Sequence, residues 1–470
     1  MSHLSGSSDP GISVVILAAG QGTRMKSDLA KVLHPVGGKP MVVRAIETAQ
    51  RVSDRLPALV IGHDGDAVRD TIGERAQFVI QAEQRGTGHA VMQAADALRD
   101  QKGMVIVFYA DMPLLRDETL HRLIRMQVQN DGPLSLLTVT AADPRGFGRI
   151  VRDVDGHVTA IVEEADATPE QRLIRELNPG VYAFRADWLW ENLSKLTPKG
   201  RKNEFYLTDM VQIAVEQGGI VAGLESDDPD EMIGVNTRVH LADAEAALRR
   251  RINEYWMLEG VTILDPATTY IQENVTIGQD TVVYPNTHLQ GHTQIGAHCV
   301  IGPNSVIVDS EIGAHCTVEA SVVEGAIMRD HAEIGPFSHL RKGAYLDEGV
   351  HMGNFGEVKN SRLGPGTRMG HFSYIGDAAI GEDVNIGAGT ITVNYDGVNK
   401  HKTVVGDHAF IGSDTMLIAP VTVEDNGHTA AGSVVTRNVP AGYIAVGVPA
   451  RMREFNGIKP LDEKEIQKGT

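Results

Sequence analysis

In the carboxyl-terminal half of the chain, an aliphatic residue returns at every sixth position over long stretches. The residues that follow this period are Ile277, Val283, Leu289, Ile295, Ile301, Ile307, Met328, Ile334, Leu340, Leu346, Met352 and Val358. The step shortens to five at three places, after which the pattern resumes: Ile307 to Ile312, Val358 to Leu363, and Ile375 to Ile380. A period of six matches neither a helix face nor the two-residue alternation of a strand. It predicts a solenoid of short parallel strands, in which each hexapeptide forms one flat face of a triangular coil and the aliphatic side chain points inward.

Two further features belong to this repeat. Glycine often follows the aliphatic residue, as at Gly296 and Gly387, and we expect it to relax the backbone at the corners of the coil. Cys299 and Cys316 are the only cysteines and lie 17 positions apart, close to one coil. We expect them to stack on adjacent coils about 4.8 Å apart. That separation permits a disulfide, but in a chain without a secretory signal we expect reduced thiols.

The amino-terminal half has a different pattern, in which apolar runs alternate with helical spacing. Buried strands are predicted at 13–20, 58–61, 104–109 and 134–139. Helices are predicted at 41–51 and 90–98. This alternation predicts an α/β domain with a mostly parallel sheet, in which ligands bind beyond the carboxyl ends of the strands.

The two halves are joined by a stretch with apolar residues at helical spacing. From Val239 to Leu258 this spacing predicts a long amphipathic helix. The Ser/Gly-rich start and the charged end of the chain are expected to be disordered. The predicted order is a tail at 1–12, an α/β domain at 13–237, a linking helix at 238–260, a solenoid at 261–455 and a tail at 456–470.

Composition excludes several classes of function. The net charge of −18 argues against a nucleic-acid partner, because phosphate backbones are bound by clustered Lys and Arg. No run of about 18 apolar residues is present, so we expect no membrane span. The first ten residues lack the apolar stretch of a secretory signal, and we expect a cytoplasmic protein.

The loop after the first predicted strand combines glycine with positive charge. Gly20 and Gly22 allow backbone N–H groups to approach a phosphate, and Arg24 and Lys31 supply charge in an otherwise acidic chain. A glycine-rich loop by itself is equally explained as a tight strand-to-helix turn. The sequence Leu-Ala-Ala-Gly-Gln-Gly-Thr-Arg-Met at 17–25, however, resembles the signature of sugar-1-phosphate nucleotidyltransferases.

This resemblance implies roles for residues of the α/β domain. UTP would be bound by the loop and by a segment that reads uracil through an amide side chain and backbone groups: Leu17, Ala18, Ala19, Gly20, Lys31, Gln81, Gly86 and Thr87. N-acetylglucosamine-1-phosphate would be bound by Tyr109, Gly148, Glu163 and Asn178. Mg²⁺ prefers hard oxygen ligands and would be held by Asp111 and Asn236, while Arg24 and Lys31 stabilise the charge of the triphosphate. Taken singly, Asn178 could be a turn residue and Glu163 an exposed carboxylate.

The solenoid carries a second set of motifs between Arg341 and Tyr395. Residues 392–402 depart from the period and predict an extruded loop, and loops on rigid scaffolds often carry function. The segments 370–374, 384–390 and 394–397 resemble the acetyltransferase half of a bacterial bifunctional family. With both halves, the resemblance covers about residues 14–446. The chain is thus identified as similar to the N-acetylglucosamine-1-phosphate uridylyltransferase/glucosamine-1-phosphate acetyltransferase family.

The family resemblance implies a second active site on the solenoid. His371 would take a proton from the amine of glucosamine-1-phosphate before it attacks the thioester of acetyl-CoA, and Glu357 would orient the His371 ring. The sugar phosphate would be bound by Arg341, Lys359, Tyr374 and Asn385. Acetyl-CoA would be bound by Ala388, Asn394, Tyr395, Ser413, Ala431 and Arg451.

Some of these assignments stay open at the level of sequence. Tyr395 or a neighbouring backbone N–H would stabilise the oxyanion of the acetyl-transfer step. Val448 stands where relatives carry a basic residue for the phosphate of CoA, so either Arg451 or Arg453 would take its place. Lys342 follows Arg341 where a proline is common, which alters the turn but keeps the guanidinium.

The resemblance also implies a fold and an assembly. The expected fold is an α/β Rossmann-like nucleotidyltransferase domain followed by a left-handed parallel β-helix of hexapeptide repeats. The expected assembly is a homotrimer with acetylation sites between subunits. The expected role of the enzyme is in the synthesis of UDP-N-acetylglucosamine. One alternative is a different nucleotidyltransferase, adenylyl or guanylyl, whose solenoid is only structural, and this leaves His371, Asn385 and Tyr395 without a use. Another is a non-catalytic scaffold, which predicts the loss of Lys31, Asp111 or Asn236, all of which are present.

Overall fold

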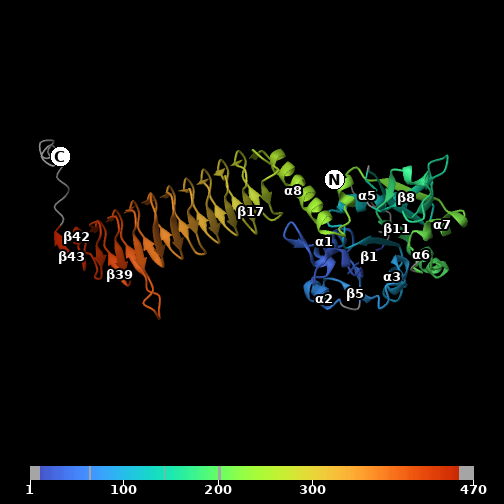
Figure 1. Ribbon diagram of the computed structural model, residues 1–470, viewed down its shortest axis with the longest axis horizontal. Helices are drawn as coiled ribbons and strands as arrows, with labels where there is room; N and C mark the ends of the chain where they lie inside the picture. Colours follow the sequence, from blue (N-terminus) through green and yellow to red (C-terminus); the bar gives the residue numbers. More distant parts are fainter. Residues whose placement is uncertain (1–10, 63–64, 142, 145, 200–202, 455–470) are drawn as a thin grey trace, which may run out of the picture. The chain divides into compact units, whose positions relative to one another are not determined.

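The computed structural model describes residues 11–62, 65–141, 143–144, 146–199 and 203–454. The chain divides into two compact units, 1–248 and 249–470, and the division falls within the long helix α8 (Arg238–Leu258) (Figure 1). This helix confirms the one predicted from the spacing at 239–258. The two tails that we expect to be disordered lie almost entirely outside the described residues. None of the described helices is both long enough and apolar enough to cross a membrane.

Unit 1 is built on a ten-stranded mixed sheet. Its strand order is β5-β4-β1-β6-β11-β7-β10-β8-β9, and β12 pairs with β7. The four parallel strands at one end are β1 (Ile12–Leu17), β4 (Ala58–Ile61), β5 (Gln77–Ile80) and β6 (Met104–Tyr109). The helices that alternate with them or follow them are α1 (Met41–Val52), α2 (Asp66–Ile72), α3 (Thr87–Gln93), α4 (Ala95–Leu98) and α5 (Asp117–Gln129). This part confirms the strands predicted at 58–61 and 104–109 and the helix predicted at 41–51, whereas the strand predicted at 13–20 ends at Leu17 and the helix predicted at 90–98 is divided between α3 and α4. The strand predicted at 134–139 is confirmed in the other half of the sheet.

The other half of the sheet is largely antiparallel. Its strands are β7 (Leu134–Thr140), β8 (Gly148–Arg152), β9 (Val158–Val162), β10 (Glu176–Asn178), β11 (Tyr182–Arg185) and β12 (Val221–Glu225). Only the β12–β7 pair is parallel among them. The expectation of a mostly parallel sheet is therefore wrong for this half. The reason is local: a turn as short as 153–157 between β8 and β9 can join only antiparallel strands. The helices of this half are α6 (Ala186–Asn192) and α7 (Asp209–Glu216).

Both faces of the parallel half are buried. Along β1, Val14 and Ile16 pack into a cluster on one face, while Val15 and Leu17 pack into a second cluster on the other. Parallel strands covered on both sides read as continuous apolar runs, which is why this strand was visible in the sequence. Because β1 ends at Leu17 and β6 at Tyr109, the residues that follow both strands lie at one edge of the sheet.

Unit 2 is a stack of short strands in three sheets, wound as a regular coil (Figure 1). The first sheet contains β13 (Thr262–Ile263), β16 (Val282–Val283), β19 (Val300–Ile301), β22 (Thr317–Val318), β25 (Glu333–Ile334), β28 (His351–Met352), β31 (Arg368–Met369), β34 (Asn385–Ile386), β37 (Phe410–Ile411), β40 (His428–Thr429), β42 (Tyr443–Val446) and β43 (Arg451–Glu454). The second contains β14 (Tyr270–Ile271), β17 (His288–Gln290), β20 (Val306–Val308), β23 (Val322–Glu324), β26 (His339–Leu340), β29 (Gly356–Lys359), β32 (Ser373–Gly376), β35 (Ile391–Val393), β38 (Met416–Ile418) and β41 (Val434–Val435). The third contains β15 (Thr276–Ile277), β18 (Gln294–Ile295), β21 (Glu311–Ile312), β24 (Ile327–Met328), β27 (Tyr345–Leu346), β30 (Arg362–Leu363), β33 (Ala378–Ile380), β36 (Thr403–Val405) and β39 (Val421–Val423). All of these pairs are parallel except β42–β43.

The repeat residues form the core of unit 2, as the period predicts. Every aliphatic residue that defines the repeat is at most 7% exposed. Cys299 and Cys316 are also buried, and the pairing of β19 with β22 places them on adjacent coils as free thiols. Residues 394–402 leave the coil as a projecting loop closed by a bridge between Tyr395 and Lys400, which confirms the extruded loop (Figure 1). The stack resumes beyond the loop, where β36 pairs with β33.

One expectation about the corners is wrong. Gly296 and Gly387 do not have positive φ. They are needed because a Cβ at either position would lie 2.6 Å from the backbone of the next coil. The left-handed conformation is taken at other positions, by polar residues such as Asp280 with φ 60 and His298 with φ 58 and by other glycines such as Gly291 with φ 65. Asp, Asn and His tolerate this region better than most side chains, so both these residues and glycine mark the corners.

Candidate active sites

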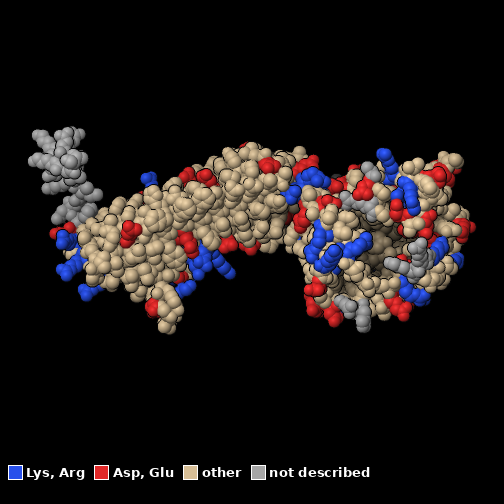
Figure 2. Space-filling model, in the orientation of Figure 1, with Lys and Arg blue, Asp and Glu red and all other residues tan. Residues whose placement is uncertain are grey.

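A cavity of about 270 Å³ lies at the carboxyl ends of β1 and β6 in unit 1. Its lining includes all eight residues predicted to bind UTP, together with Tyr109 and Asp111. A second cavity of about 460 Å³ shares part of this lining, including Lys31 and Gln84. Figure 2 shows Lys and Arg side chains gathered beside a hollow in unit 1. The fold therefore brings the glycine loop and the Gln81 segment to one site, where parallel α/β sheets place their ligands.

The glycine loop is shaped by Gly22 and Lys31. Gly22 has φ 62, and a Cβ there would lie 2.6 Å from Cβ of Lys31. Glycine is thus required for Lys31, at the start of a short 3₁₀ turn (Lys31–Leu33), to fold back over the loop. Arg24 lies in the preceding 3₁₀ turn (Thr23–Met25), is exposed, and does not line either cavity.

The two predicted metal ligands lie side by side. Lys31 Nζ donates to a carboxylate oxygen of Asp111 and lies 3.2 Å from Oδ1 of Asn236. A backbone hydrogen bond of 2.8 Å from Val235 N to the carbonyl oxygen of Asp111 joins the two segments. A carboxylate and an amide oxygen therefore converge on one cationic group, and such hard donors fit a small divalent cation.

A network that the sequence did not indicate supports these segments. Arg238, at the start of α8, donates from Nε to the carbonyl oxygen of Met25 at 3.3 Å, and its Nη1 lies 3.3 Å from Nδ1 of His34. Burial, together with the charge of Arg238, lowers the pKa of His34. His240 Nδ1 lies 3.4 Å from the backbone N of Asn236. These contacts tie the loop at 23–34 to the segment that carries Asn236.

The residues predicted to bind the sugar phosphate lie next to Tyr109. Asn178 and Gly148 face each other across β10 and β8. Burial raises the pKa of the Tyr109 hydroxyl, and the nearby carboxylates of Glu163 and Asp111 raise it further. Burial also raises the pKa of Glu163, whose carboxylate accepts a 2.9 Å hydrogen bond from Thr208 Oγ1. Glu163 is thus half-buried and bonded, rather than the exposed carboxylate of the simplest interpretation.

The segment predicted to read the base is held by an irregular segment, 204–207, that sequence analysis missed. Gly86 has φ 100, and a Cβ there would lie 2.5 Å from the carbonyl oxygen of Phe205. Leu207 N donates to Oγ1 of Thr87 at 3.0 Å. Glu204 lines the cavity directly. No local pattern marks these contacts, because the partners are more than 100 residues apart in the chain.

In unit 2, the predicted base and three predicted acetyl-CoA residues form one column. Arg368, Asn385, Phe410 and His428 are paired on successive coils in β31, β34, β37 and β40. The residues three positions after each of them therefore lie one above another at a corner of the coil. These residues are His371, Ala388, Ser413 and Ala431. Backbone N–H groups of the next coil donate to the carbonyl oxygens of Ala388 and Ser413 at 2.6 and 2.8 Å.

The predicted sugar-phosphate residues divide between two sheets. Arg341, Lys359 and Tyr374 lie on adjacent coils in the second sheet, whereas Asn385 lies in β34 of the first. Glu357 accepts a 2.8 Å hydrogen bond from Nη1 of Arg341. Within the described residues, no hydrogen bond joins Glu357 to His371.

A cation that the sequence did not single out adds to this group. The charge of Lys400, followed by that of Arg341, lowers the pKa of Lys359. Three cationic side chains thus lie close enough to repel one another on an acidic chain, which is a typical arrangement for binding a phosphate.

The remaining predicted acetyl-CoA residues lie in the loop and at the end of the coil. Asn394 is 9% exposed and donates to Oδ2 of Asp377 at 2.5 Å. Tyr395 is 58% exposed, and its hydroxyl donates to the carbonyl oxygen of Gly397 at 2.6 Å. Arg451 lies in β43, opposite Val446 of β42. Figure 2 shows Lys and Arg side chains gathered at this end of unit 2.

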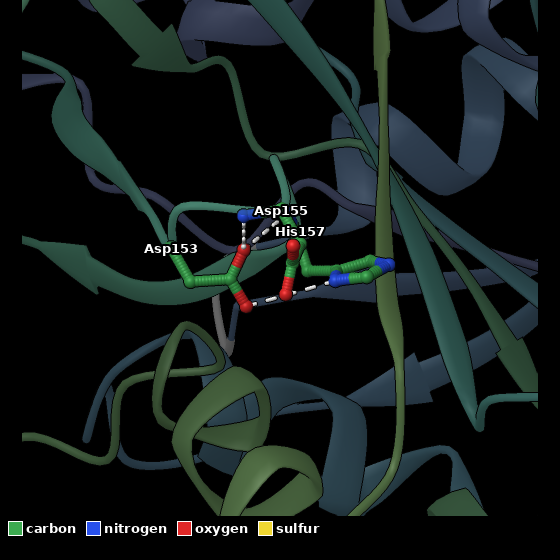
Figure 3. A group of neighbouring side chains, drawn as sticks. All are labelled: Asp153, Asp155 and His157. Atoms are coloured by element: carbon green, nitrogen blue, oxygen red, sulfur yellow. Dashed lines mark hydrogen bonds and ion pairs between the residues drawn. The ribbon is translucent and has the colours of Figure 1, made fainter.

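One cluster away from both sites has the composition of a metal centre. Asp153, Asp155 and His157 bring ligand atoms within 4.8 Å of one another in the turn between β8 and β9 (Figure 3). Oδ1 of Asp153 accepts from the backbone N of Asp155 at 3.0 Å and of His157 at 2.9 Å. These bonds, above all that from His157, lower the pKa of Asp153. The cluster is thus explained as a turn whose backbone donors are capped by a carboxylate.

Comparisons with known proteins agree with the geometry of both units. Residues 14–178 match the family of MobA-like NTP transferase domains. Residues 274–308 match bacterial transferase hexapeptide repeats, and residues 402–437 match the hexapeptide repeat of succinyl-transferase, which agrees with a left-handed parallel β-helix.

Full-length relatives are found among curated proteins. "Bifunctional protein GlmU" of Exiguobacterium sibiricum is 47% identical over 446 residues, which is 95% of this chain and 98% of the relative. The proteins of the same name from Geobacillus thermodenitrificans and Enterococcus faecalis are 45% and 46% identical, over 96% and 94% of this chain and 98% and 96% of their own lengths.

Proposed function

This chain belongs to the family of the bifunctional GlmU proteins, and we propose which of its residues carry the two transferase activities. The enzyme acetylates glucosamine-1-phosphate with acetyl-CoA, and it transfers UMP from UTP to N-acetylglucosamine-1-phosphate with release of pyrophosphate. The observation that carries the assignment is that residues matched by motif alone meet in space, in the cavity of unit 1 and along the column of unit 2.

We assign uridylyl transfer to the cavity at the ends of β1 and β6. An oxygen of the sugar phosphate attacks the α-phosphorus of UTP, so the protein must mainly position the substrates and neutralise charge. The base is assigned to Gln81, Gly86 and Thr87, and the triphosphate to the Gly20 loop and Lys31, with Arg24 as a further source of positive charge. The sugar is assigned to the neighbouring group: Tyr109, Gly148, Glu163 and Asn178.

Nucleotidyl transfer of this kind usually needs a divalent metal, and we propose Mg²⁺ at Asp111 and Asn236. The converging carboxylate and amide oxygens support this choice. When bound, the ion neutralises charge on the phosphates. The ammonium group of Lys31 contacts both oxygens and lines the same cavity, which supports its assignment to the triphosphate.

We assign acetyl transfer to the column of unit 2. His371 accepts the proton of the glucosamine amine, the amine attacks the thioester carbonyl, and CoA leaves. Adjacent coils are about 4.8 Å apart, so the column from His371 to Ala431 is about 14 Å long and suits an extended thioester arm. Arg341, Lys359 and Lys400 face the sugar phosphate, and Glu357 acts by holding Arg341.

We further propose that a second and a third copy of the chain complete this site. Phe337 and Phe355 are 62% exposed and stack with centroids 5.4 Å apart, and Phe372, beside His371, is 55% exposed on the next coil. Such an apolar strip next to a predicted base supports a subunit interface. Asn385, which lies on another sheet than Arg341, is then free to serve a neighbouring copy. Light scattering is expected to give three times the chain mass, and a monomer with full acetyl transfer would refute the proposal.

The decisive experiment follows both products in one mixture. The protein is incubated with glucosamine-1-phosphate, acetyl-CoA, UTP and Mg²⁺, and free CoA, pyrophosphate and the UDP-sugar are followed by mass spectrometry. Asp111→Ala is expected to abolish pyrophosphate release and retain CoA release. His371→Ala is expected to lower CoA release by about 10²- to 10⁴-fold, and to retain pyrophosphate release when N-acetylglucosamine-1-phosphate is supplied. Pyrophosphate without CoA from the unaltered protein would leave unit 2 a purely structural part.

A further inference from the structure

The side-chain amide of Gln81 has a single allowed orientation. Gln81 is 3% exposed and lines the cavity of unit 1. Its Nε2 lies 3.0 Å from the carbonyl oxygen of Gly86 and 3.0 Å from Nδ1 of His89. A carbonyl oxygen only accepts hydrogen bonds, so the atom that faces Gly86 must be the amide nitrogen, with two N–H donors. Nδ1 of His89 must then accept the second of them.

This arrangement leaves the amide oxygen for a ligand. Both N–H groups of Gln81 are bonded within the protein, and Oε1 accepts no hydrogen bond from any residue that the structure describes. Gln81 therefore presents an acceptor to the cavity. Turning the amide over would place its oxygen against the carbonyl oxygen of Gly86 and offer a donor to the ligand instead.

The second of these hydrogen bonds requires Nδ1 of His89 to be unprotonated. With Nδ1 as acceptor, the single proton of the neutral ring is on Nε2, which lies 3.3 Å from Nε2 of Gln93. An amide nitrogen only donates, so the amide of Gln93 must be turned over to place its oxygen against this N–H. Burial and the charge of Arg85 lower the pKa of His89, while the side chain and the backbone carbonyl of Glu83 act in the opposite direction. The ring stacks on Phe205 with centroids 6.2 Å apart. The neutral form is thus the one the surroundings favour at neutral pH.

We infer that His89 is a positioning residue that makes uridylyl transfer selective for uracil over cytosine, an inference that rests on the proposed role of Gln81 at the base. Uracil carries a hydrogen on N3, which an amide oxygen can accept, whereas N3 of cytosine is itself an acceptor. An acceptor in a fixed position therefore forms a hydrogen bond with the uracil of UTP and is repelled by N3 of the cytosine of CTP. A site built around one hydrogen bond rejects the analogue that cannot make it, because a buried polar group is then left unpaired. His89 does not touch the base, and acts only through Gln81.

Two substitutions separate this role from simple packing. His89→Phe keeps a ring against Phe205 but removes the acceptor at Nδ1. His89→Asn loses the ring but keeps an acceptor, since its Oδ1 branches from Cγ as Nδ1 does. We expect His89→Phe to raise KM for UTP about 10-fold with a smaller change in kcat, and to reduce the UTP/CTP ratio of kcat/KM by at least as much. His89→Asn is expected to retain most of that ratio.

The pH dependence gives an independent measurement. Protonation at Nδ1 removes the acceptor, so the UTP/CTP ratio of the unaltered enzyme is expected to hold at neutral pH and to fall once the pH drops below the lowered pKa of His89. The other charged groups that act on the ring are the carboxylate of Glu83 and the guanidinium of Arg85. His89→Asn keeps both of these groups and removes only the imidazole, so this variant should keep a flat ratio.

The controls distinguish the possible failures. Acetyl transfer by unit 2 in the same samples reports intact protein, and the unaltered enzyme must use UTP, since its failure to do so would overturn the proposed function itself. If the unaltered enzyme prefers UTP and His89→Phe keeps the full preference, the inference is wrong. If His89→Asn loses as much selectivity as His89→Phe, the ring and not its acceptor is what matters, which also overturns it.

Discussion

Replacing Glu231 with alanine is expected both to destabilise unit 1 and to weaken metal binding at the site proposed for Asp111 and Asn236. Glu231 is fully buried in a short 3₁₀ turn (Pro229–Met232). Its carboxylate accepts from Arg116 Nε at 2.7 Å and Nη2 at 2.6 Å, from the backbone N of Arg116 at 3.2 Å and from Thr119 Oγ1 at 2.9 Å. These bonds join the start of α5, shortly after Asp111, to the turn that precedes Asn236.

The expected loss in the free energy of unfolding depends on which groups are left without a hydrogen-bond partner. A hydrogen bond to a charged group contributes about 1.5–3 kcal/mol. The guanidinium of Arg116 is 45% exposed and returns to water, so its two bonds count for little. The hydroxyl of Thr119, which is 3% exposed, and the backbone N–H of Arg116 gain no new partner. We therefore expect Glu231→Ala to lower the free energy of unfolding of unit 1 by about 2–4 kcal/mol.

Tryptophan fluorescence during urea unfolding measures this change in one unit. The chain has three tryptophans, and a Trp256→Phe background leaves only Trp188 and Trp190, both in unit 1. Glu191→Ala, at an exposed position of α6, is the matched control, with an expected change within about 0.5 kcal/mol. Glu231→Ala should also need more Mg²⁺ for pyrophosphate release, with CoA release unchanged. Equal stability of the two variants would refute the reasoning.

Three other outcomes are expected. Cys299 and Cys316, each 1% exposed, should react with a thiol reagent only after unfolding, and rapid labelling of the native protein would contradict their placement. Glu163→Gln should stabilise unit 1 increasingly as the pH rises above about 4.5 and through the raised pKa of Glu163, because burial raises this pKa and ionisation then favours the unfolded chain. A difference in urea midpoints that does not change with pH would contradict this. Arg238→Ala should raise KM for UTP at unchanged acetyl transfer, since Arg238 holds the loop that carries Lys31, and an unaltered KM would exclude that link.

Much of the fold could be predicted because its rules are local. In unit 2 each inward residue is repeated by the coil, so the period alone places the core. The corners could not be predicted in the same way, since the need for Gly296 arises from the neighbouring coil and not from its own φ. In unit 1, β1, β4 and β6 were visible as apolar runs, and so was β7 of the antiparallel half. The direction in which β7 and its neighbours pair depends on the turns between strands, which the apolar runs do not show.

In the candidate sites, too, local features of the sequence could be predicted and contacts between distant segments could not. Motifs found residues that line the cavity, such as Gln81 and Lys31, because these lie in short segments of distinctive composition. The residues that hold them in place come from elsewhere in the chain. His89 and Gln81 are eight positions apart, but Phe205, which closes over the same segment, is more than 100 positions away and has no pattern of its own. Such supporting contacts become visible only when the tertiary fold is known.

The acetyl-transfer column shows how a repeat can carry a site without being interrupted by it. The steps along the column are 17 residues from His371 to Ala388, 25 from there to Ser413, and 18 to Ala431. The longer middle step contains the loop at 394–402, yet β33 and β36 pair in register on either side of it. The extra residues therefore form a loop outside the coil, and the strands on either side of the loop stay in register, because each inward aliphatic side chain must still reach the core. In the proposed acetyl-transfer site, the loop would thus supply Asn394 and Tyr395 while the rigid stack fixes the position of His371.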